Sequence, residues 1–232
     1  MITVRKSDER GHAQFDWLDS RHSFSFGDYR DPSHMGFHAL RVINEDHIAG
    51  GGGFGSHPHR DMEILTYVVS GVLQHKDNLG NSAPIRPGEL QRMSAGTGIV
   101  HSEFNASKTE PVHLLQIWLL PDKKGLWPGY EQKQFSRKEK LNRLCLVASS
   151  DARDNSLTIH QDVKLFVSVL ETQKELKHEV LAGRAAWIQV IRGALKINGQ
   201  ISNAGDGVAV EGNETLRVEA MEESEFLLFD LA

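Results

Sequence analysis

Short apolar stretches recur along the chain, and glycine, asparagine, aspartate and proline separate them. Stretches of this length that are bounded by turn residues are typical of β-strands. Long runs with a helical period are scarce, and only residues 138–144, after the capping candidate Ser136, predict a turn or two of helix. The pattern predicts an all-β sandwich or barrel, with strands over residues 64–69, 113–120, 144–148, 165–170, 187–191 and 225–231.

A weak internal repeat divides the chain into two halves. Residues 68–73 resemble residues 190–195, and residues 86–90 resemble residues 203–207. In both halves a strand, a glycine turn and a second strand are followed by a turn in which an acidic residue comes directly after glycine. Two copies of one β-barrel in tandem explain this repeat better than one larger barrel.

A charged segment that contains the turn signal Trp127-Pro128-Gly129 lies between the two halves. We therefore predict a first barrel over residues 1–125, a linker over residues 126–142 and a second barrel over residues 143–232. We also expect an aromatic side chain of this segment to pack between the halves.

Composition and charge narrow the class of protein. The 232 residues are 39% hydrophobic and include ten Phe and four Trp, which is enough for a buried core. The net charge of -5 gives no electrostatic footprint for nucleic acid. Cys145 is the only cysteine, so no intrachain disulfide forms, and its apolar neighbours predict a buried thiol. No apolar stretch is long enough for the core of a signal peptide or for a membrane span. We expect a cytoplasmic protein with no direct nucleic-acid or membrane partner, and a monomer as the working oligomeric state.

Two short motifs carry the chemistry, namely His57-Pro58-His59 and His101-Ser102-Glu103. Residues i and i+2 of a β-strand point to the same face, so two such strands facing one another would aim three nitrogens and one oxygen at one point. This donor set suits iron, zinc, nickel, copper, cobalt or manganese. Three or four protein ligands leave positions open for water or substrate, which is typical of a catalytic metal site. With twelve histidines in the chain one pair could arise by chance, but a second pair with its own glycine-rich approach favours a metal site.

Glu63 is a rival carboxylate. On a straight strand it would lie roughly 13 Å beyond His59, too far to share an ion. A turn between the two residues would bring it back, either as a ligand or as a partner that orients a ligand histidine. The alternative is an ion pair with Arg60 or with another surface cation.

The remaining histidines lack the spacing of metal ligands. His75 faces either the barrel interior or solvent, and His113 opens an apolar strand, where we expect a hydrogen-bonded core histidine. The second half offers only His160 and His178. We therefore expect the second barrel to be free of metal.

The spacing of these motifs resembles the cupin superfamily. The segment 51–63 follows the first cupin motif, and the segment 98–105 follows the end of the second. Two departures stand out: Gly71 comes one residue later than usual, and Gly96 replaces the usual proline of the second motif. Within the cupins, the segments 15–26, 57–63 and 87–103 resemble the pirins, and specifically the bacterial pirin-like quercetinases.

The resemblance implies a bicupin fold, two tandem β-barrels of the jelly-roll type with metal only in the first. It also implies a metal-dependent dioxygenase that cleaves the heterocyclic ring of flavonols such as quercetin with O2 and releases CO. One divalent transition-metal ion is implied, with Fe2+ expected first and Zn2+, Co2+, Ni2+, Cu2+ or Mn2+ as alternatives. Glu103 would serve both as a ligand and as the acceptor of the proton from the flavonol 3-hydroxyl. The implied metal ligands are His57, His59, His101 and Glu103.

Two other classes of function stay open at this point. A pirin-like protein can be a metal-sensing or redox-sensing regulator that binds a protein partner. A cupin isomerase acting on a sugar phosphate would need cations near the site, for which Arg60 and Arg92 are the candidates. Aromatic residues of the N-terminal segment either line the approach to the metal and stack on a flat polyphenol or pack in the core; they are Phe24, Phe26, Tyr29 and Phe37.

Overall fold

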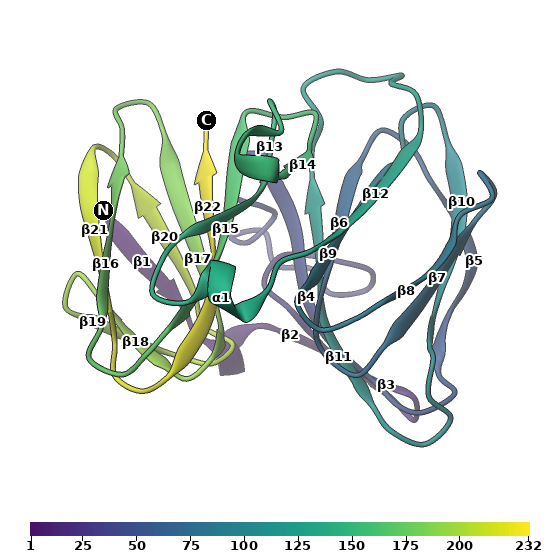
Figure 1. The fold of residues 1–232 in the computed structure, drawn as a ribbon, viewed down its shortest axis with the longest axis horizontal. Helices are drawn as coiled ribbons and strands as arrows, with labels where there is room; N and C mark the ends of the chain where they lie inside the picture. Colours follow the sequence, from purple (N-terminus) through teal and green to yellow (C-terminus); the bar gives the residue numbers. More distant parts are fainter.

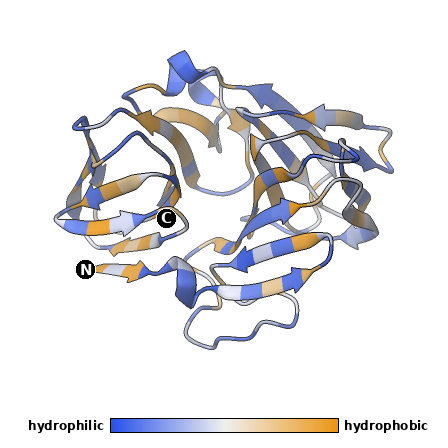
Figure 2. Cartoon of the chain, turned by 90° about the horizontal axis from the view of Figure 1, so that it is seen from below, coloured by the Kyte–Doolittle hydropathy of each residue, from blue (hydrophilic) through white to orange (hydrophobic).

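In the computed structural model, which describes residues 1–232, the chain forms two β-barrels that lie side by side (Figure 1). Each barrel combines a seven-stranded sheet with a four-stranded sheet. Hydrophobic and hydrophilic residues alternate along many strands (Figure 2), as expected for sheets with one face toward a barrel interior. The predicted all-β architecture of two tandem barrels is confirmed.

In Figure 1 the strands of the first barrel are coloured from purple (β2 and β3) through blue to teal. Its large sheet has the order β12 (Gly129–Gln134), β9 (Glu89–Ser94), β6 (Glu63–Ser70), β11 (Val112–Leu119), β4 (Leu40–Ile48), β3 (Leu18–His22) and β2 (Gly11–Phe15). Its small sheet has the order β5 (Gly53–His59), β10 (Ile99–Asn105), β7 (Leu73–Asp77) and β8 (Ser82–Ile85).

The second barrel repeats this arrangement. Its large sheet has the order β1 (Ile2–Arg5), β20 (Gly207–Glu211), β17 (Ala185–Arg192), β22 (Ser224–Leu231), β15 (Val163–Leu170), β13 (Cys145–Ser149) and β14 (Leu157–Thr158). Its small sheet has the order β16 (Glu175–Val180), β21 (Glu214–Ala220), β18 (Ala194–Ile197) and β19 (Gln200–Asn203). Short helical turns lie at Ser7–Glu9, α1 (Arg137–Lys140) and Arg153–Asn155.

The edge strands of the two large sheets are exchanged between the halves. β1, at the start of the chain, pairs with β20 of the second barrel, and β12, which lies inside the segment predicted as a linker, pairs with β9 of the first. The two strands occupy the same edge position in their sheets. Backbone pairing of β1 and β12 therefore joins the two halves of the chain.

The two barrels also share their largest apolar core, a cluster of 23 buried residues drawn from both large sheets. Trp187 of β17 contacts Phe24 and Phe37 of the N-terminal segment, with ring centroids 4.9 and 5.6 Å apart. Trp127 of the linker does not pack at the junction, because it is 89% exposed. Phe135 of the linker is 3% exposed and belongs to the shared core, so the expected aromatic between the halves is present.

All six strands predicted from hydrophobic runs are present, each within two residues at either end. Each of them lies inside a large sheet, with a hydrogen-bonded strand on both sides. The short helix also forms after Ser136, whose hydroxyl accepts a hydrogen bond from the Glu139 N–H while the Glu139 carboxylate accepts one from the Ser136 N–H. No helix of the structure combines the length and the apolar character that a membrane crossing requires.

Candidate metal centre

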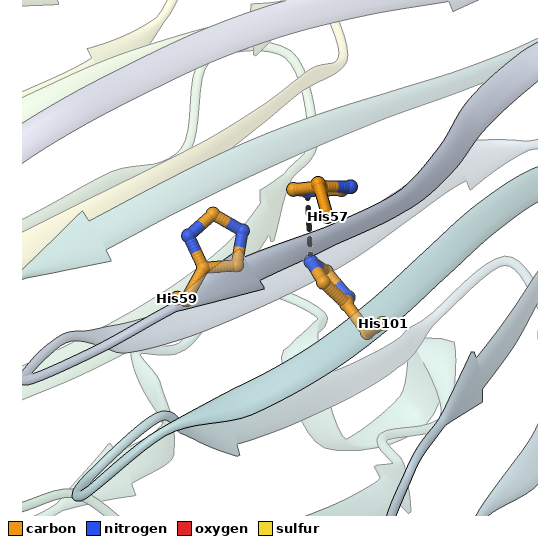
Figure 3. Close-up of side chains that lie close together, drawn as sticks. All are labelled: His57, His59 and His101. Carbon is orange, nitrogen blue, oxygen red and sulfur yellow. Dashed lines mark hydrogen bonds between the residues drawn. The ribbon is translucent and has the colours of Figure 1, made fainter.

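The two motifs lie on neighbouring strands of the first small sheet. β5 and β10 pair antiparallel, which places His57 directly opposite His101, and His59 opposite Ile99. The three imidazoles converge on one side of the sheet (Figure 3). The same-face rule for residues i and i+2 therefore brings His57 and His59 together, and strand pairing adds His101.

The three imidazoles are spaced as ligands of one ion. Their donor atoms all lie within 4.8 Å of one another, and the Nε2 atoms of His57 and His101 are 3.1 Å apart. Two nitrogens that each sit ~2.0–2.1 Å from one ion, at tetrahedral or octahedral angles, are separated by ~3 Å. The observed spacing fits a shared metal ion.

Two of these histidines are held in the form that binds metal. Burial, followed by the charge of the neighbouring His57, lowers the pKa of His59 to about 4. Burial, followed by the charges of His57 and His59, lowers the pKa of His101 to about 3. Both side chains are therefore neutral at pH 7, and a neutral imidazole has the free lone pair that coordination needs.

The glycine-rich approach to His57 has a steric cause. A Cβ on Gly53 would lie 2.5 Å from the Glu103 carbonyl oxygen, a distance that no side chain tolerates. The β5–β10 register also shifts between His101 and Glu103. Glycine lets the two backbones approach closely at this irregularity, and the shift sets the direction of Glu103 relative to the histidines.

Glu103 lies deeper in the barrel than the three histidines. Its donor atom groups with those of His101 and His75, whereas His57 and His59 lie outside that group. Gln116 Nε2 donates a hydrogen bond to Glu103 Oε2 at 2.8 Å, and the Thr66 hydroxyl lies 3.3 Å from Oε1. Burial raises the pKa of Glu103 to about 7. The structure thus gathers three of the four predicted ligands and places the fourth next to one of them.

His75 is the neighbour that the sequence left undecided. It is fully buried, Nε2 lies 3.1 Å from Asp77 Oδ2, and its ring packs against Tyr130 and His101. Its Nδ1 atom has no hydrogen-bond partner. Strand β7 pairs His75 with Glu103 of β10, so the pairing register, which no local pattern in the sequence reveals, brings it to the site.

Glu63 lies away from the histidine cluster. Its buried carboxylate is 3.3 Å from His160 Nδ1 and accepts a hydrogen bond from the His160 N–H. Arg60 donates instead to the Thr97 carbonyl. Glu63 is therefore neither a metal ligand candidate nor a partner of Arg60, and it joins the first barrel to the second.

A cavity of about 440 Å³ opens beside the histidines. Aromatic and apolar side chains form much of its wall, and no lysine or arginine lines it. Phe26 and Tyr29 line the cavity as expected for the approach to the metal, whereas Phe24 and Phe37 pack in the shared core. The sequence did not single out the other aromatic residues of the wall, which are Phe15, Phe54 and Trp118.

The cations named for a sugar-phosphate site are engaged elsewhere. Arg92 forms an ion pair with Glu131 at 2.7 Å, and neither Arg92 nor Arg60 lines the cavity. The carboxyl groups of Asp28, Asp46 and Glu103 line it instead. An anionic substrate would meet no lysine or arginine there, so the lining of the cavity disfavours the isomerase hypothesis.

Comparison with known proteins gives two family matches and full-length relatives. Residues 3–119 match the pirin family, and residues 146–231 match the quercetinase C-terminal cupin domain. The quercetin 2,3-dioxygenase of Escherichia coli K12 is 50% identical over 231 residues, covering 100% of this chain and 99% of that protein. A pirin-like protein of Caulobacter vibrioides is 36% identical over 233 residues, covering 100% of both chains.

Solved structures agree with these matches. The crystal structure of YhhW from Escherichia coli has a TM-score of 0.97 at 50% identity, covering 100% of this chain and 98% of that one. The complex of the bacterial pirin YhhW with nickel(II) has a TM-score of 0.95 at 50% identity, covering 100% of this chain and 99% of that one. With matching family models, sequence and fold, the chain belongs to the pirin family of the cupin superfamily.

Proposed function

We propose that this pirin is a metal-dependent dioxygenase that opens the heterocyclic ring of a flavonol such as quercetin with O2 and releases CO. The observation that carries the proposal is the convergence of three imidazoles on the wall of an aromatic-lined cavity without cations. A flat, neutral polyphenol matches that wall in shape and polarity. The E. coli relative named quercetin 2,3-dioxygenase supports the same activity.

The proposed ligands of one divalent ion are His57, His59, His101 and Glu103. Glu103 completes the set because its carboxylate lies beside His101 and lines the same cavity. The nickel(II) complex of the E. coli relative supports a divalent ion, and the choice among Fe2+, Ni2+ and the other first-row ions follows geometry and supply. When bound, the ion supplies Lewis-acid and electron-transfer chemistry.

The protein residues supply proton transfer and orientation. Glu103 accepts the proton of the flavonol 3-hydroxyl, a role that suits a carboxylate whose pKa burial raises to about 7. The hydrogen bond from Gln116 fixes its carboxylate. Trp118, whose ring meets His59 edge to face with centroids 4.9 Å apart, closes the wall beside the histidines and limits the access of water.

The test is to load the metal-free protein separately with Fe2+, Ni2+, Zn2+, Co2+, Cu2+ and Mn2+. Each form is then assayed for quercetin loss under O2 and for CO in the headspace. We expect turnover with at least one redox-active ion and equimolar CO. The absence of turnover with every ion, while elemental analysis shows the ion bound, would overturn the proposed activity.

A further inference from the structure

The cavity wall formed by the large sheet of the first barrel is polar where a barrel interior is usually apolar. Strand pairing places His22 opposite Asn44, Asn44 opposite Gln116, and Gln116 opposite Thr66. The four side chains form one row across β3, β4, β11 and β6. At one end of the row, Thr66 and Gln116 contact Glu103. At the other end, His22 and Asn44 line the cavity and take no part in holding Glu103.

A hydrogen-bonded chain fixes the protonation of His22. The Ser20 hydroxyl donates to Asp46 Oδ1 at 2.5 Å, and His22 Nε2 lies 2.9 Å from the same serine oxygen. Because serine has a single hydroxyl hydrogen, its oxygen must accept from His22 Nε2–H. The other ring nitrogen, Nδ1, is then an acceptor. Burial lowers the pKa of His22 to about 4, so the ring is neutral at pH 7.

The two residues leave polar atoms unpaired. His22 Nδ1 and Asn44 Oδ1 are both buried without a hydrogen-bond partner, in side chains that are 6% and 4% exposed. A buried polar atom without a partner costs about 1–3 kcal/mol. Directly opposite residues of an antiparallel pair have Cβ atoms about 5 Å apart, so both acceptors serve one small region of the cavity.

The surroundings of this pair select its ligand. The carboxylate of Asp46 behind Ser20 repels an anion, and no lysine or arginine lines the cavity to attract one. The rings of Phe26 and Tyr29 flank His22 with centroids 5.4 and 6.3 Å away. A neutral donor attached to a flat ring satisfies all of these conditions.

We propose that His22 and Asn44 form a recognition site for the hydroxyl groups of an aromatic ring, best met by a ring with two adjacent hydroxyls. His22 Nδ1 and the Asn44 amide accept the hydroxyl hydrogens, and Ser20 and Asp46 act as positioning residues that set the tautomer of His22. This proposal rests on the proposed function, because it assigns the end of the cavity that selects the substrate while the histidine cluster acts on the heterocyclic ring.

The test compares two flavonols that differ only at the outer ring. Quercetin carries two adjacent hydroxyls there and galangin carries none. Binding of each to the metal-loaded protein is measured without oxygen, by quenching of tryptophan fluorescence. The wild-type protein should bind quercetin about tenfold more tightly or better, since one hydrogen bond contributes about 1.4 kcal/mol. His22→Phe and Asn44→Leu should each lower quercetin affinity about tenfold and leave galangin affinity within twofold.

His47→Phe is the matched control, because His47 lies on β4 next to Asp46 but is exposed and faces away from the cavity. It should leave both affinities unchanged. Equal affinities of the wild-type protein for the two flavonols would overturn the proposal, without any need for a variant. An equal loss of both ligands in His22→Phe would also overturn it, because that pattern indicates a structural role.

The two proposals fail in different ways. A preference for quercetin that depends on His22, in a protein that never turns quercetin over, would support the recognition site and refute the dioxygenase. Turnover of quercetin and galangin with equal affinity would support the dioxygenase and refute the recognition site.

Discussion

The two barrels share one backbone plan and differ in what fills them. In the first large sheet the inward row across β6, β11 and β4 is Thr66, Gln116 and Asn44. In the second large sheet the corresponding row across β17, β22 and β15 consists of Ile188, Leu228 and Phe166. The polar row borders a cavity, whereas the apolar row belongs to or packs against a core of 14 buried residues.

The small sheets repeat the contrast at the metal centre. His57 pairs with His101 across β5 and β10, and His178 pairs with Leu216 at the corresponding place across β16 and β21. Val218, two residues beyond Leu216, takes the place of Glu103 and is buried in the core. The Nε2 atom of His178 lies 3.2 Å from Oδ2 of Asp230. At the positions that correspond to His101 and Glu103, two of the proposed ligands, the second barrel therefore places the core residues Leu216 and Val218.

The difference shows how the protein separates stability from chemistry. A barrel filled with Leu, Val and Ile gains burial energy, whereas a barrel lined with His, Asn and Gln gives up some of that energy for a site. The shared core and the exchanged strands β1 and β12 join the two. The second barrel thereby supports the first.

The largest expected effect is the difference between removing His101 from the first barrel and removing His178 from the second. His101→Ala removes a proposed central ligand, so we expect metal binding to fall at least a hundredfold and quercetin turnover to be lost. His178→Ala, at the second-barrel position that corresponds to His57, the strand partner of His101, should leave both within twofold. Metal content by elemental analysis and initial rates check the pair. Equal behaviour of the two variants would remove the functional distinction between the barrels.

The reverse contrast appears in stability. Leu216 is fully buried, so Leu216→Ala should lower the free energy of unfolding by about 2–5 kcal/mol through lost burial and a cavity. His101→Ala in the metal-free protein should cost less, because this side chain already borders a cavity. Urea unfolding of both metal-free variants gives the comparison. A larger loss in His101→Ala would contradict the division of roles.

A pH effect distinguishes the polar wall of the first barrel. Burial raises the pKa of Asp46 from 3.8 to about 6. Between these values Asp46 binds more protons in the folded state than in the unfolded state, so the contribution of Asp46 to the stability of the metal-free protein should fall as pH rises from 4 to 6 and then level off. At 1.36 kcal/mol for each unit by which the pKa is raised, the loss of stability due to Asp46 reaches about 3 kcal/mol above pH 6.

Asp46→Asn should abolish this part of the pH dependence and make the metal-free protein relatively more stable above pH 6. The corresponding residue of the second barrel is Ser168, opposite Phe226 as Asp46 is opposite Leu114. Ser168→Ala is the control, and its effect should be independent of pH. Urea titrations at pH 4.5 and 7.5 would contradict the account if Asp46→Asn and Ser168→Ala gave the same pH profile.

The smallest expected effect concerns the junction between the barrels. Trp127 is exposed, so Trp127→Ala should change the free energy of unfolding by less than about 0.5 kcal/mol. Trp187→Ala should cost about 3–5 kcal/mol, because that ring fills the shared core. Thermal and urea unfolding of the two variants check the assignment. A large effect of Trp127→Ala would mean that the loop packs in solution.

The sequence predicted the strands and the histidine cluster for the same reason. Continuous apolar runs identify central strands, and an H-x-H motif puts two ligands on one face of a strand by local geometry alone. The exchange of β1 and β12 was missed, because the choice of a distant partner leaves no local pattern. His75, Asn44 and Gln116 were missed as neighbours of the site for the same reason, since each is an isolated polar residue until the pairing register places it.

The most direct test of the metal centre is an anomalous difference map from crystals of the protein loaded with Ni2+ or Fe2+, recorded at the absorption edge of the ion. We expect one peak per chain, bounded by His57, His59 and His101 and within bonding distance of a Glu103 oxygen. A peak in the second barrel, a peak that lacks His57 and His59, or the absence of any peak would contradict this expectation.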